Sequence, residues 1–280
     1  MKNRFFYKVF AVWCFQVRQM FCGWKNIGVF LLTGIFVFSN AQQVGDFADL
    51  VQLGTRPWIF PHLTNDFICQ LVFVAACVAL FCDAPWDTDM SPYVLARSGR
   101  SAQTAGQLLF ILTLGLAFTL YLFAVSVAAI LPSAEFAPGW GKVLGTLART
   151  NAGMQIGLSF TVSDYLIGAY SPGEATCLSL ALEWGCFVWL GLAVYLFNRN
   201  FVRRSGIYIA AAFVLLDITI ANALTPFAYR FSPVTLAQLS ALSGLNARYG
   251  ISLNYAVGFF AAGNLLMAIT ALLLSRRKSK

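Results

Sequence analysis

The sequence predicts an all-α membrane protein with six transmembrane helices, an N-terminal interfacial amphipathic helix and both termini in the cytosol. Of its 280 residues, 59% are hydrophobic and only 11% are charged, whereas a soluble domain usually carries about 25% charged residues. The mean hydropathy is +0.72. The apolar runs are continuous and close to the roughly 20 residues that cross a bilayer. They therefore indicate helices rather than the alternating strands of a membrane barrel.

Residues 26–280 are expected to form one membrane domain. Its six spans lie at about 26–40, 66–82, 105–131, 175–197, 206–223 and 251–274. With the N-terminus inside, 14 of the 19 Lys and Arg residues fall in cytosolic segments and 5 fall outside. Basic residues concentrate on the cytosolic side of membrane proteins. The same bias accounts for the net charge of +8, and without a basic-aromatic module no nucleic-acid partner is expected.

Residues 1–25 precede the first span and combine five basic residues with an apolar stripe. The stripe recurs at helical spacing and consists of Phe6, Phe10, Trp13, Val17 and Phe21. This pattern is typical of an amphipathic helix lying on the cytosolic membrane surface. The alternative is a frayed basic leader that only sets orientation.

Three segments are expected on the outer side of the membrane. Residues 41–65 should form a loop, because they contain two prolines. In the moderately apolar segment 133–174, residues 139–160 are expected to form one helix at the outer surface or dipping part-way into the membrane. Within 224–250, residues 233–245 are expected to form a short helix.

Cysteine and histidine usage limits the possible crosslinks and metal sites. Most of the seven cysteines lie inside apolar runs, where they behave as small hydrophobic residues. Cys69 and Cys177 both lie near the outer ends of spans, so one disulfide between them is conceivable. With His62 as the single histidine, no zinc site built on several histidines is available, and no metal is expected.

Two acidic residues lie inside apolar runs, Glu183 in the fourth span and Asp217 in the fifth. At about 1.5 Å per residue, both come near the middle of the membrane. Buried ionisable groups in lipid cost several kcal/mol and suggest a functional site. The two acids could share a proton, bind a cation or meet a basic substrate. Alternatively, each is neutral and hydrogen-bonds a neighbouring helix, with Asn222 or Asn264 as a partner.

Small residues in two spans predict close helix contacts. They are Gly185 and Gly191 in the fourth span, and Gly258, Ala262 and Gly263 in the sixth.

The polar stretch Asp83–Arg100, between the second and third spans, is the most informative. Ser91 is expected to cap a short helix with Pro92 at its first position, and Gly99 is expected to end it. The helix would present Arg97 and Arg100 on the cytosolic face. The alternative is a basic loop that only fixes topology.

No motif for hydrolysis or nucleotide binding is present in the sequence. Gly141-Lys142 is followed by Val143 and lacks the upstream glycine of a P-loop. No G-x-S-x-G elbow and no H-E-x-x-H pair occur. We therefore expect no catalytic residues and no cofactor bound by this chain, so any ATP hydrolysis must reside on a separate subunit.

This topology resembles that of the permease subunits of type 2 ABC exporters. The run Ser91-Pro92-Tyr93 to Arg97-Ser98-Gly99-Arg100 is similar to a short Pro and Arg-Ser-Gly-Arg signature of some bacterial permease subunits. The resemblance implies an ATP-driven transporter in a bacterial inner or plasma membrane. A separate cytosolic ATP-binding subunit would hold ATP and Mg and dock on residues 91–100, with Pro92, Tyr93, Arg97 and Arg100 as coupling residues. It also implies a second permease subunit. The chain departs from the family in the length of segment 133–174.

The sequence leaves two other classes of protein open. A membrane scaffold or sensor would bind a cytosolic partner through the same surface and transport nothing. A membrane-embedded enzyme acting on a lipid would use Glu183, Asp217 or Asp164 as acid or base, although the missing histidine and metal motifs argue against it.

Overall fold

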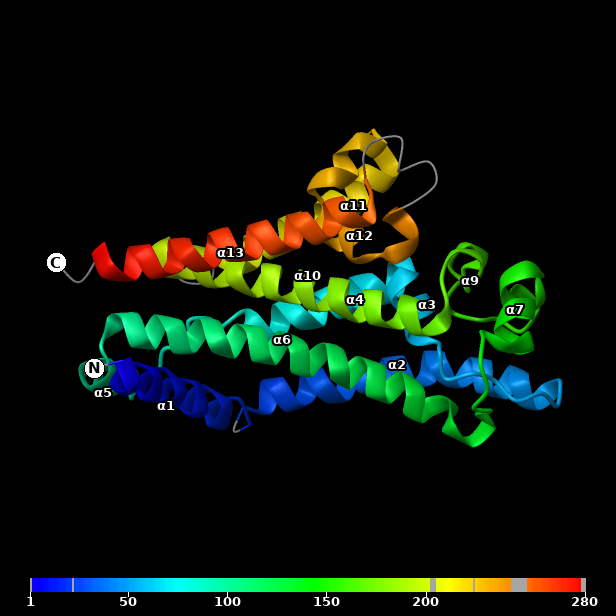
Figure 1. Ribbon diagram of the computed structural model, residues 1–280, viewed down its shortest axis with the longest axis horizontal. Helices are drawn as coiled ribbons and strands as arrows, with labels where there is room; N and C mark the ends of the chain where they lie inside the picture. The colour runs from blue at the N-terminus through cyan, green and yellow to red at the C-terminus, as the bar shows by residue number, and fades with distance from the viewer. Residues whose placement is uncertain (1, 22, 202–204, 224, 243–250, 278–280) are drawn as a thin grey trace.

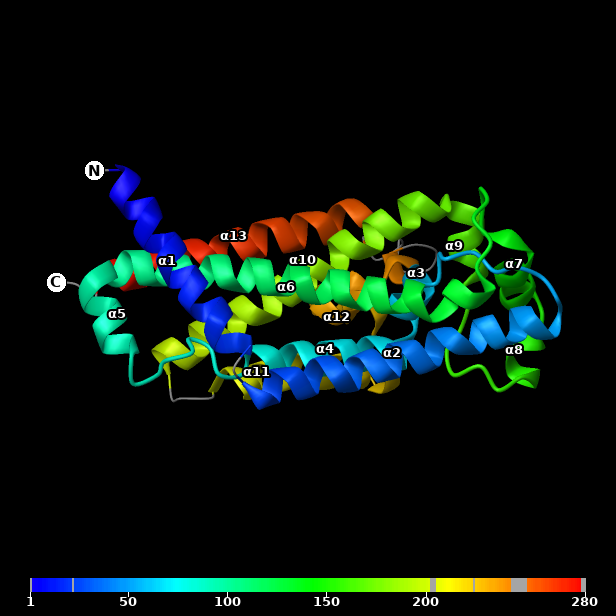
Figure 2. The same ribbon diagram turned by 90° about the horizontal axis from the view of Figure 1, so that it is seen from below.

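The computed structural model describes residues 2–21, 23–201, 205–223, 225–242 and 251–277. Every regular element in these ranges is a helix, and the long helices run side by side in an elongated bundle (Figures 1 and 2). The four longest are α2 (Trp24–Leu50), α6 (Arg100–Ile130), α10 (Pro172–Asn200) and α13 (Leu253–Arg277). Each of the four is long and apolar enough to cross a membrane. The predicted all-helical class is thus confirmed.

The second and fifth expected spans form shorter helices. α4 (Phe67–Phe81) has 15 residues, which at about 1.5 Å per residue is less than a hydrocarbon core of about 30 Å. α11 (Ser205–Ala223) has 19 residues, and its apolar part is 205–220. The short helix α3 (Phe60–Asn65) precedes α4 and is mostly buried. Asp66 separates the two and caps α4 by accepting two backbone N–H hydrogen bonds at 3.0 and 3.1 Å.

Helix α2 continues ten residues beyond the expected end of the first span, so a loop beginning at residue 41 is wrong. The extension is amphipathic, with Ala41, Val44 and Ala48 fully buried on one face and Gln42 and Asp46 exposed on the other. Its polar residues lowered the apparent hydropathy without breaking the helix. The extension carries α2 alongside the outer segments of the chain (Figure 2).

Helix α6 lies at the centre of the bundle and contacts α1, α2, α10 and α13. Two of these contacts are hydrogen bonds to backbone carbonyl groups inside the apolar region. The Tyr121 hydroxyl donates to the Phe30 carbonyl of α2 at 2.7 Å, and the Trp184 indole of α10 donates to the Leu112 carbonyl at 3.0 Å. Aromatic and aliphatic packing fills the remaining space around α6, including Phe118 against Phe187.

Three of the small residues predicted to allow close packing do so. A Cβ atom on Gly191 would lie 2.9 Å from Ile111 and 3.2 Å from the Phe81 ring. A Cβ on Gly185 would lie 3.1 Å from Phe260, and one on Gly263 would lie 3.0 Å from Trp189. Gly258 has no heavy atom within 4 Å of the corresponding position, so the prediction is wrong there.

The predicted N-terminal helix is α1 (Lys2–Phe21), which crosses α6 at a slant (Figure 2). The two helices pack closely at Gly106, where an added Cβ would lie 2.7 Å from Val12. The Trp13 indole donates to the Thr113 hydroxyl at 2.8 Å.

The predicted stripe of α1 divides between two surroundings. Trp13 and Val17 pack against the core, while Phe6, Phe10 and Phe21 are exposed.

The outer segment 133–174 does not contain one helix over 139–160. It forms the short helices α7 (Gly141–Arg149), α8 (Ala152–Gln155) and α9 (Asp164–Ala169). Thr150 is extended, with φ −127° and ψ 166°, and Gly157 has a left-handed φ of 70°, so the backbone turns twice within the expected helix. We call these three helices and their connections the outer cap, because they lie at the end of the bundle away from α5 (Figure 1).

Buried polar contacts fix the outer cap to the bundle. The backbone N–H of Ser163 donates to Nδ1 of His62 at 3.3 Å, and the imidazole packs against Trp140 at 5.0 Å between ring centroids. Complete burial lowers the pKa of His62 to about 3, so the ring is neutral at physiological pH. The Trp140 indole in turn donates to the Tyr170 carbonyl at 2.9 Å.

Residues 226–242 fold back against the bundle as three short elements. They are η2 (Pro226–Phe231), α12 (Pro233–Ala237) and η3 (Leu239–Leu242). Helix α12 is wholly buried and contacts α10, α11 and α4. The short helix expected at 233–245 therefore begins as predicted but breaks at Gln238, whose ψ of 109° is extended. Its last three residues lie outside the described part of the chain.

The disulfide considered between Cys69 and Cys177 is absent. Cys69 is buried and Cys177 is exposed, and both are free thiols.

The packing predicts different outcomes for two glycine substitutions in apolar helices. Gly191→Ala should destabilise the folded protein by about 1–3 kcal/mol, because the methyl group overpacks fully buried neighbours. Gly258→Ala meets open space and should be neutral or slightly stabilising. Thermal unfolding of the detergent-solubilised variants measures both. Equal unfolding midpoints for the two variants would contradict the packing.

Candidate functional site

The short helix predicted in the polar stretch is α5 (Ser91–Ser98), and it lies at the same end of the bundle as the start of α1 and the end of α13 (Figure 1). Ser91 does not cap it; Met90 occupies that position, and the Ser91 hydroxyl accepts from the Thr88 backbone N–H at 2.8 Å. Gly99 ends the helix as predicted, with φ 82° and ψ 154°. α6 begins at the next residue, so a single glycine joins α5 to the central helix.

The four predicted coupling residues do not form one cluster. Tyr93 is 70% exposed, and no residue of α5 is buried. Pro92 and Arg100 line a cavity of about 770 Å³ between α5, α6 and the end of α10. Arg97 instead lines a separate cavity of about 550 Å³ between α5 and α1. The two arginines therefore face different surroundings, which the sequence did not indicate.

A chain of hydrogen bonds forms one wall of the larger cavity. The Arg199 guanidinium donates to the Thr104 hydroxyl at 2.7 Å and also to the Tyr195 hydroxyl. Tyr195 donates to the side-chain oxygen of Gln107 at 3.0 Å, and the Gln107 amide donates to the Pro85 carbonyl. This network ties α6 and α10 to the connection between α4 and α5.

Sequence reasoning missed this network. Its signal was present, because Thr104 and Gln107 are three residues apart and Tyr195 and Arg199 are four apart, which places each pair on one helix face.

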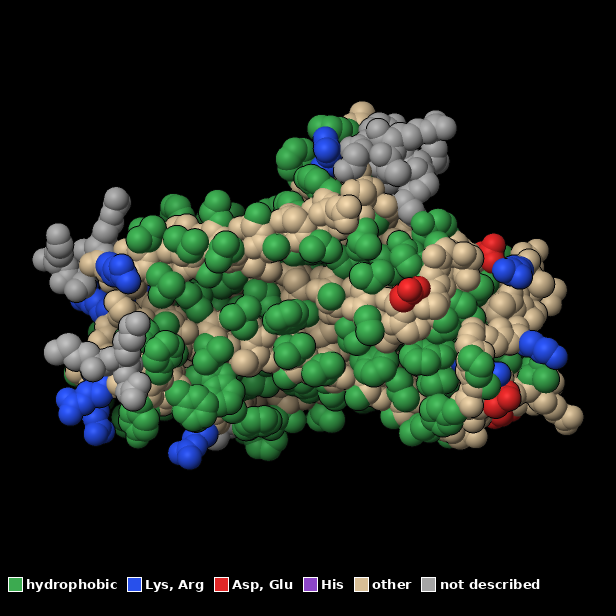
Figure 3. All heavy atoms as spheres, in the orientation of Figure 1, with side chains coloured by type: hydrophobic (Ala, Val, Ile, Leu, Met, Phe, Trp, Pro, Cys, Tyr) green, Lys and Arg blue, Asp and Glu red, His purple; other side chains and the backbone are tan. Residues whose placement is uncertain are grey.

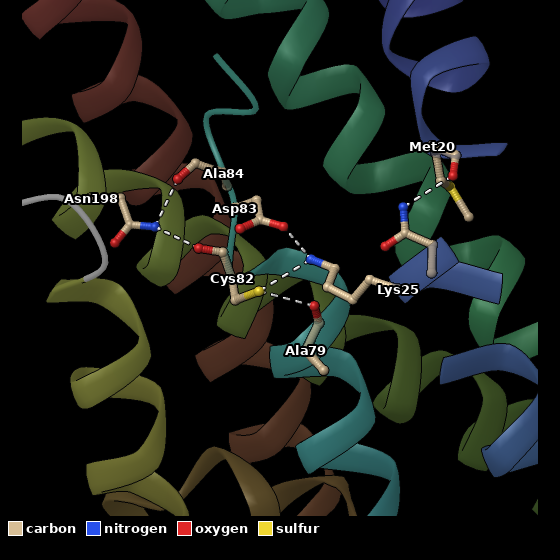
Figure 4. A network of polar contacts seen from close by, with 8 residues as sticks. Met20, Lys25, Ala79, Cys82, Asp83, Ala84 and Asn198 are labelled. Carbon is tan, nitrogen blue, oxygen red and sulfur yellow. Dashed lines mark hydrogen bonds and ion pairs between the residues drawn. The ribbon is translucent and has the colours of Figure 1, made fainter. Parts of the chain in front are cut away.

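A second network holds the end of α4 (Figure 4). Lys25, at the start of α2, forms an ion pair with Asp83 and donates to the Cys82 sulfur at 3.2 Å. The Asn198 amide of α10 donates to the carbonyl groups of Cys82 at 3.1 Å and Ala84 at 2.7 Å. Side chains of α2 and α10 thus hold residues 82–84, which directly follow α4. These contacts fix the start of the connection that leads to α5.

The two acids predicted near the membrane middle are buried but have separate partners. Glu183 accepts from the Gln70 amide of α4 at 3.0 Å. Asp217 accepts from the Ser232 hydroxyl at 2.7 Å and from Thr235. The shared-proton pair is therefore not formed.

The asparagine partners suggested for the acids were wrong. Asn222 donates to the Ile218 carbonyl at 2.8 Å and Asn264 to the Gly185 carbonyl at 3.2 Å. The prediction that each acid hydrogen-bonds a neighbouring segment is confirmed, but the partners are Gln70 for Glu183, and Ser232 and Thr235 for Asp217.

Polar atoms around Glu183 are incompletely satisfied. Within the described residues, Glu183 Oε1, Gln70 Oε1 and Ser179 Oγ are buried without a hydrogen-bond partner. An unpaired buried polar group is costly, and Ser179 lies one helical turn from Glu183 on α10. Within the described ranges, no group of three or more His, Cys, Asp or Glu side chains lies close enough together to hold a metal ion.

The three acids suggested for an enzyme do not converge. Asp164 forms an ion pair with Arg149 at 2.9 Å within the outer cap, whereas Glu183 and Asp217 are 0% and 2% exposed inside the bundle. No shared substrate cleft connects them among the cavities described.

Comparisons with protein-family models, curated proteins and solved structures found no match to this chain.

The junction at Gly99 gives a test of how firmly α5 is held. Gly99→Ala puts a side chain at a backbone conformation that is almost exclusive to glycine, at a cost of about 1–3 kcal/mol, although nothing obstructs its Cβ. We expect faster tryptic cleavage after Arg97 and Arg100, because cleavage requires local opening of α5. Gly28→Ala, in the open surroundings of α2, is the control. Unchanged cleavage in both variants would show that the junction does not constrain α5.

Proposed function

We propose that this protein is a permease subunit of an ATP-driven transporter of the type 2 ABC exporter kind, in a bacterial inner or plasma membrane. A separate cytosolic subunit binds ATP and Mg and hydrolyses the nucleotide. Docking of that subunit on α5 transmits its closure to the membrane helices, which switch the substrate path between inward and outward access. A second permease subunit completes the transporter.

The observation that carries the proposal is the position of α5. None of its residues is buried, and it lies at the end of the bundle where α1 begins and α13 ends (Figure 1). One residue separates it from the 31-residue helix α6. A push on α5 therefore acts directly on the helix that contacts α1, α2, α10 and α13. The networks at Asn198 and Gln107 fix the other side of the connection.

Six spans with both termini in the cytosol are part of the same proposal. Four helices have sufficient length, and α4 and α11 supply the other two if the bilayer is locally thin or the flanking residues snorkel. In the view of Figure 3, Lys and Arg side chains lie at both ends of the molecule, but no Asp or Glu is visible beside them at the end where α1 begins and α13 ends. The flank between the two ends is mainly hydrophobic (Figure 3). Such a distribution favours placing that end in the cytosol.

Helix α13 supports the presence of a second subunit. Only 11% of its apolar window is buried within this chain, compared with 61% for α10. Lipid can cover such a face, and a second permease subunit would use the same apolar side chains, among them Leu265, Leu266 and Leu273.

Charge reversal on α5 tests the docking directly. We expect Arg97→Glu with Arg100→Glu to abolish co-purification of an ATP-binding protein with the tagged chain from its host membranes in mild detergent. Reversed charge repels an acidic docking surface, and like charges brought together at an interface cost several kcal/mol. Mass spectrometry of the co-purified proteins gives the measurement.

Arg97→Lys with Arg100→Lys is the matched control, because it keeps both charges, and it should retain most of the partner. Undiminished capture by the glutamate variant would refute the coupling role. Capture of a partner that lacks nucleotide-binding motifs would favour the scaffold or sensor class instead.

A further inference from the structure

The cavity between α1 and α5 is lined by basic and apolar side chains. Its volume is about 550 Å³. Arg4 and Lys8 of α1 and Arg97 of α5 supply the charge, and Tyr7 and Ser98 add hydroxyl groups. The apolar lining consists of Ala11, Val12, Phe15 and Val94. Two segments that are some 90 residues apart in the chain thus place three cations around one hollow.

None of these cations is neutralised by the protein. In the part of the chain that the structure describes, the ion pairs involve Lys25, Arg56 and Arg149 and leave Arg4, Lys8 and Arg97 without an acidic partner. All three side chains are exposed. The three cations line one cavity without a protein counter-charge, so an anion bound there would be attracted by all three.

The surroundings of the cavity indicate which anion fits. Phe6, Tyr7 and Phe10 are 67%, 75% and 55% exposed on α1, next to the basic residues. Helices with basic and aromatic side chains of this kind lie at the headgroup level of a membrane. The basic lining residues suit the phosphate of a phospholipid, and the apolar lining residues suit the start of its acyl chains.

We propose that this cavity is a binding site for the phosphate headgroup of an anionic phospholipid, which bridges α1 and α5. Arg4, Lys8 and Arg97 hold the phosphate, and the apolar lining residues contact the glycerol and the first acyl carbons. The lipid thereby fixes the distance between the interfacial helix and the exposed helix. The site stands on its own geometry and does not require the transport role proposed above.

Lipid binding by purified protein tests the site, with native mass spectrometry as the readout. The protein in detergent is titrated with phosphatidylglycerol, with zwitterionic phosphatidylcholine and with inorganic phosphate. We expect phosphatidylglycerol to bind at least tenfold more tightly than the other two, because each basic side chain near an anionic lipid is worth roughly fivefold in affinity.

The decisive variant is Arg4→Gln with Lys8→Gln, which leaves α5 unchanged. It should weaken phosphatidylglycerol binding on the order of tenfold or more. The matched control is Arg18→Gln with Arg276→Gln, which removes two exposed basic groups from the same end without touching the cavity, and it should bind like the native protein. If the double variant does not fold, Lys8→Gln is compared with Arg18→Gln.

Three results would overturn the site. They are equal binding of the two lipids, undiminished binding by the cavity variant, or inorganic phosphate that binds as tightly as phosphatidylglycerol. The last result would assign the cavity to a free anion rather than a lipid. The readout is lipid occupancy and not partner capture, so a failure here is separate from a failure of ATPase docking.

Discussion

The close packing of α6 against its neighbours is the constraint on which the other features depend. Gly106 lets α1 approach α6, and Gly115 of α6 faces Val188 of α10. The Tyr121 hydroxyl and the Trp184 indole donate hydrogen bonds to backbone carbonyl groups where α6 meets α2 and α10. A packed interior resists gradual deformation, so these contacts restrain α6 relative to its neighbours. The helix α5 is joined to α6 through Gly99 alone, so a displacement of α5 bears on α6 through that one residue.

The two ends of the molecule differ in the polar contacts that hold them. At the α5 end, charged and amide side chains join the starts and ends of α2, α4, α6 and α10, and two cavities open beside the short helix. At the other end, His62, Trp140 and Ser163 fasten the outer cap. Between the ends, Glu183 and Asp217 are each held by a different neighbouring segment. The proposed transport role assigns docking to the α5 end, and it leaves the buried acids as polar groups inside the bundle.

Hydropathy alone predicted the helical class and the approximate places of the main helices, because lipid leaves the backbone few alternatives. The α5 boundaries were also predictable, since Pro92 and Gly99 act through local backbone preferences. The extension of α2 was missed because Gln42 and Asp46 are exposed on one face of a continuing helix. The cap and the return of α12 to the bundle depend on contacts between distant residues, such as Asp217 with Ser232 and Asn65 with Ser240. No local pattern in the sequence encodes those contacts.

Photo-crosslinking from α5 in intact membranes tests the central claim most directly. A photoreactive phenylalanine analogue replaces Tyr93, which is 70% exposed, and in a control it replaces Met154, which is 84% exposed in the outer cap. Docking of an ATPase on α5 predicts a crosslinked product between position 93 and an ATP-binding protein, and no such product from position 154. Absence of a product at position 93, or equal products at both positions, would contradict docking of an ATPase on α5.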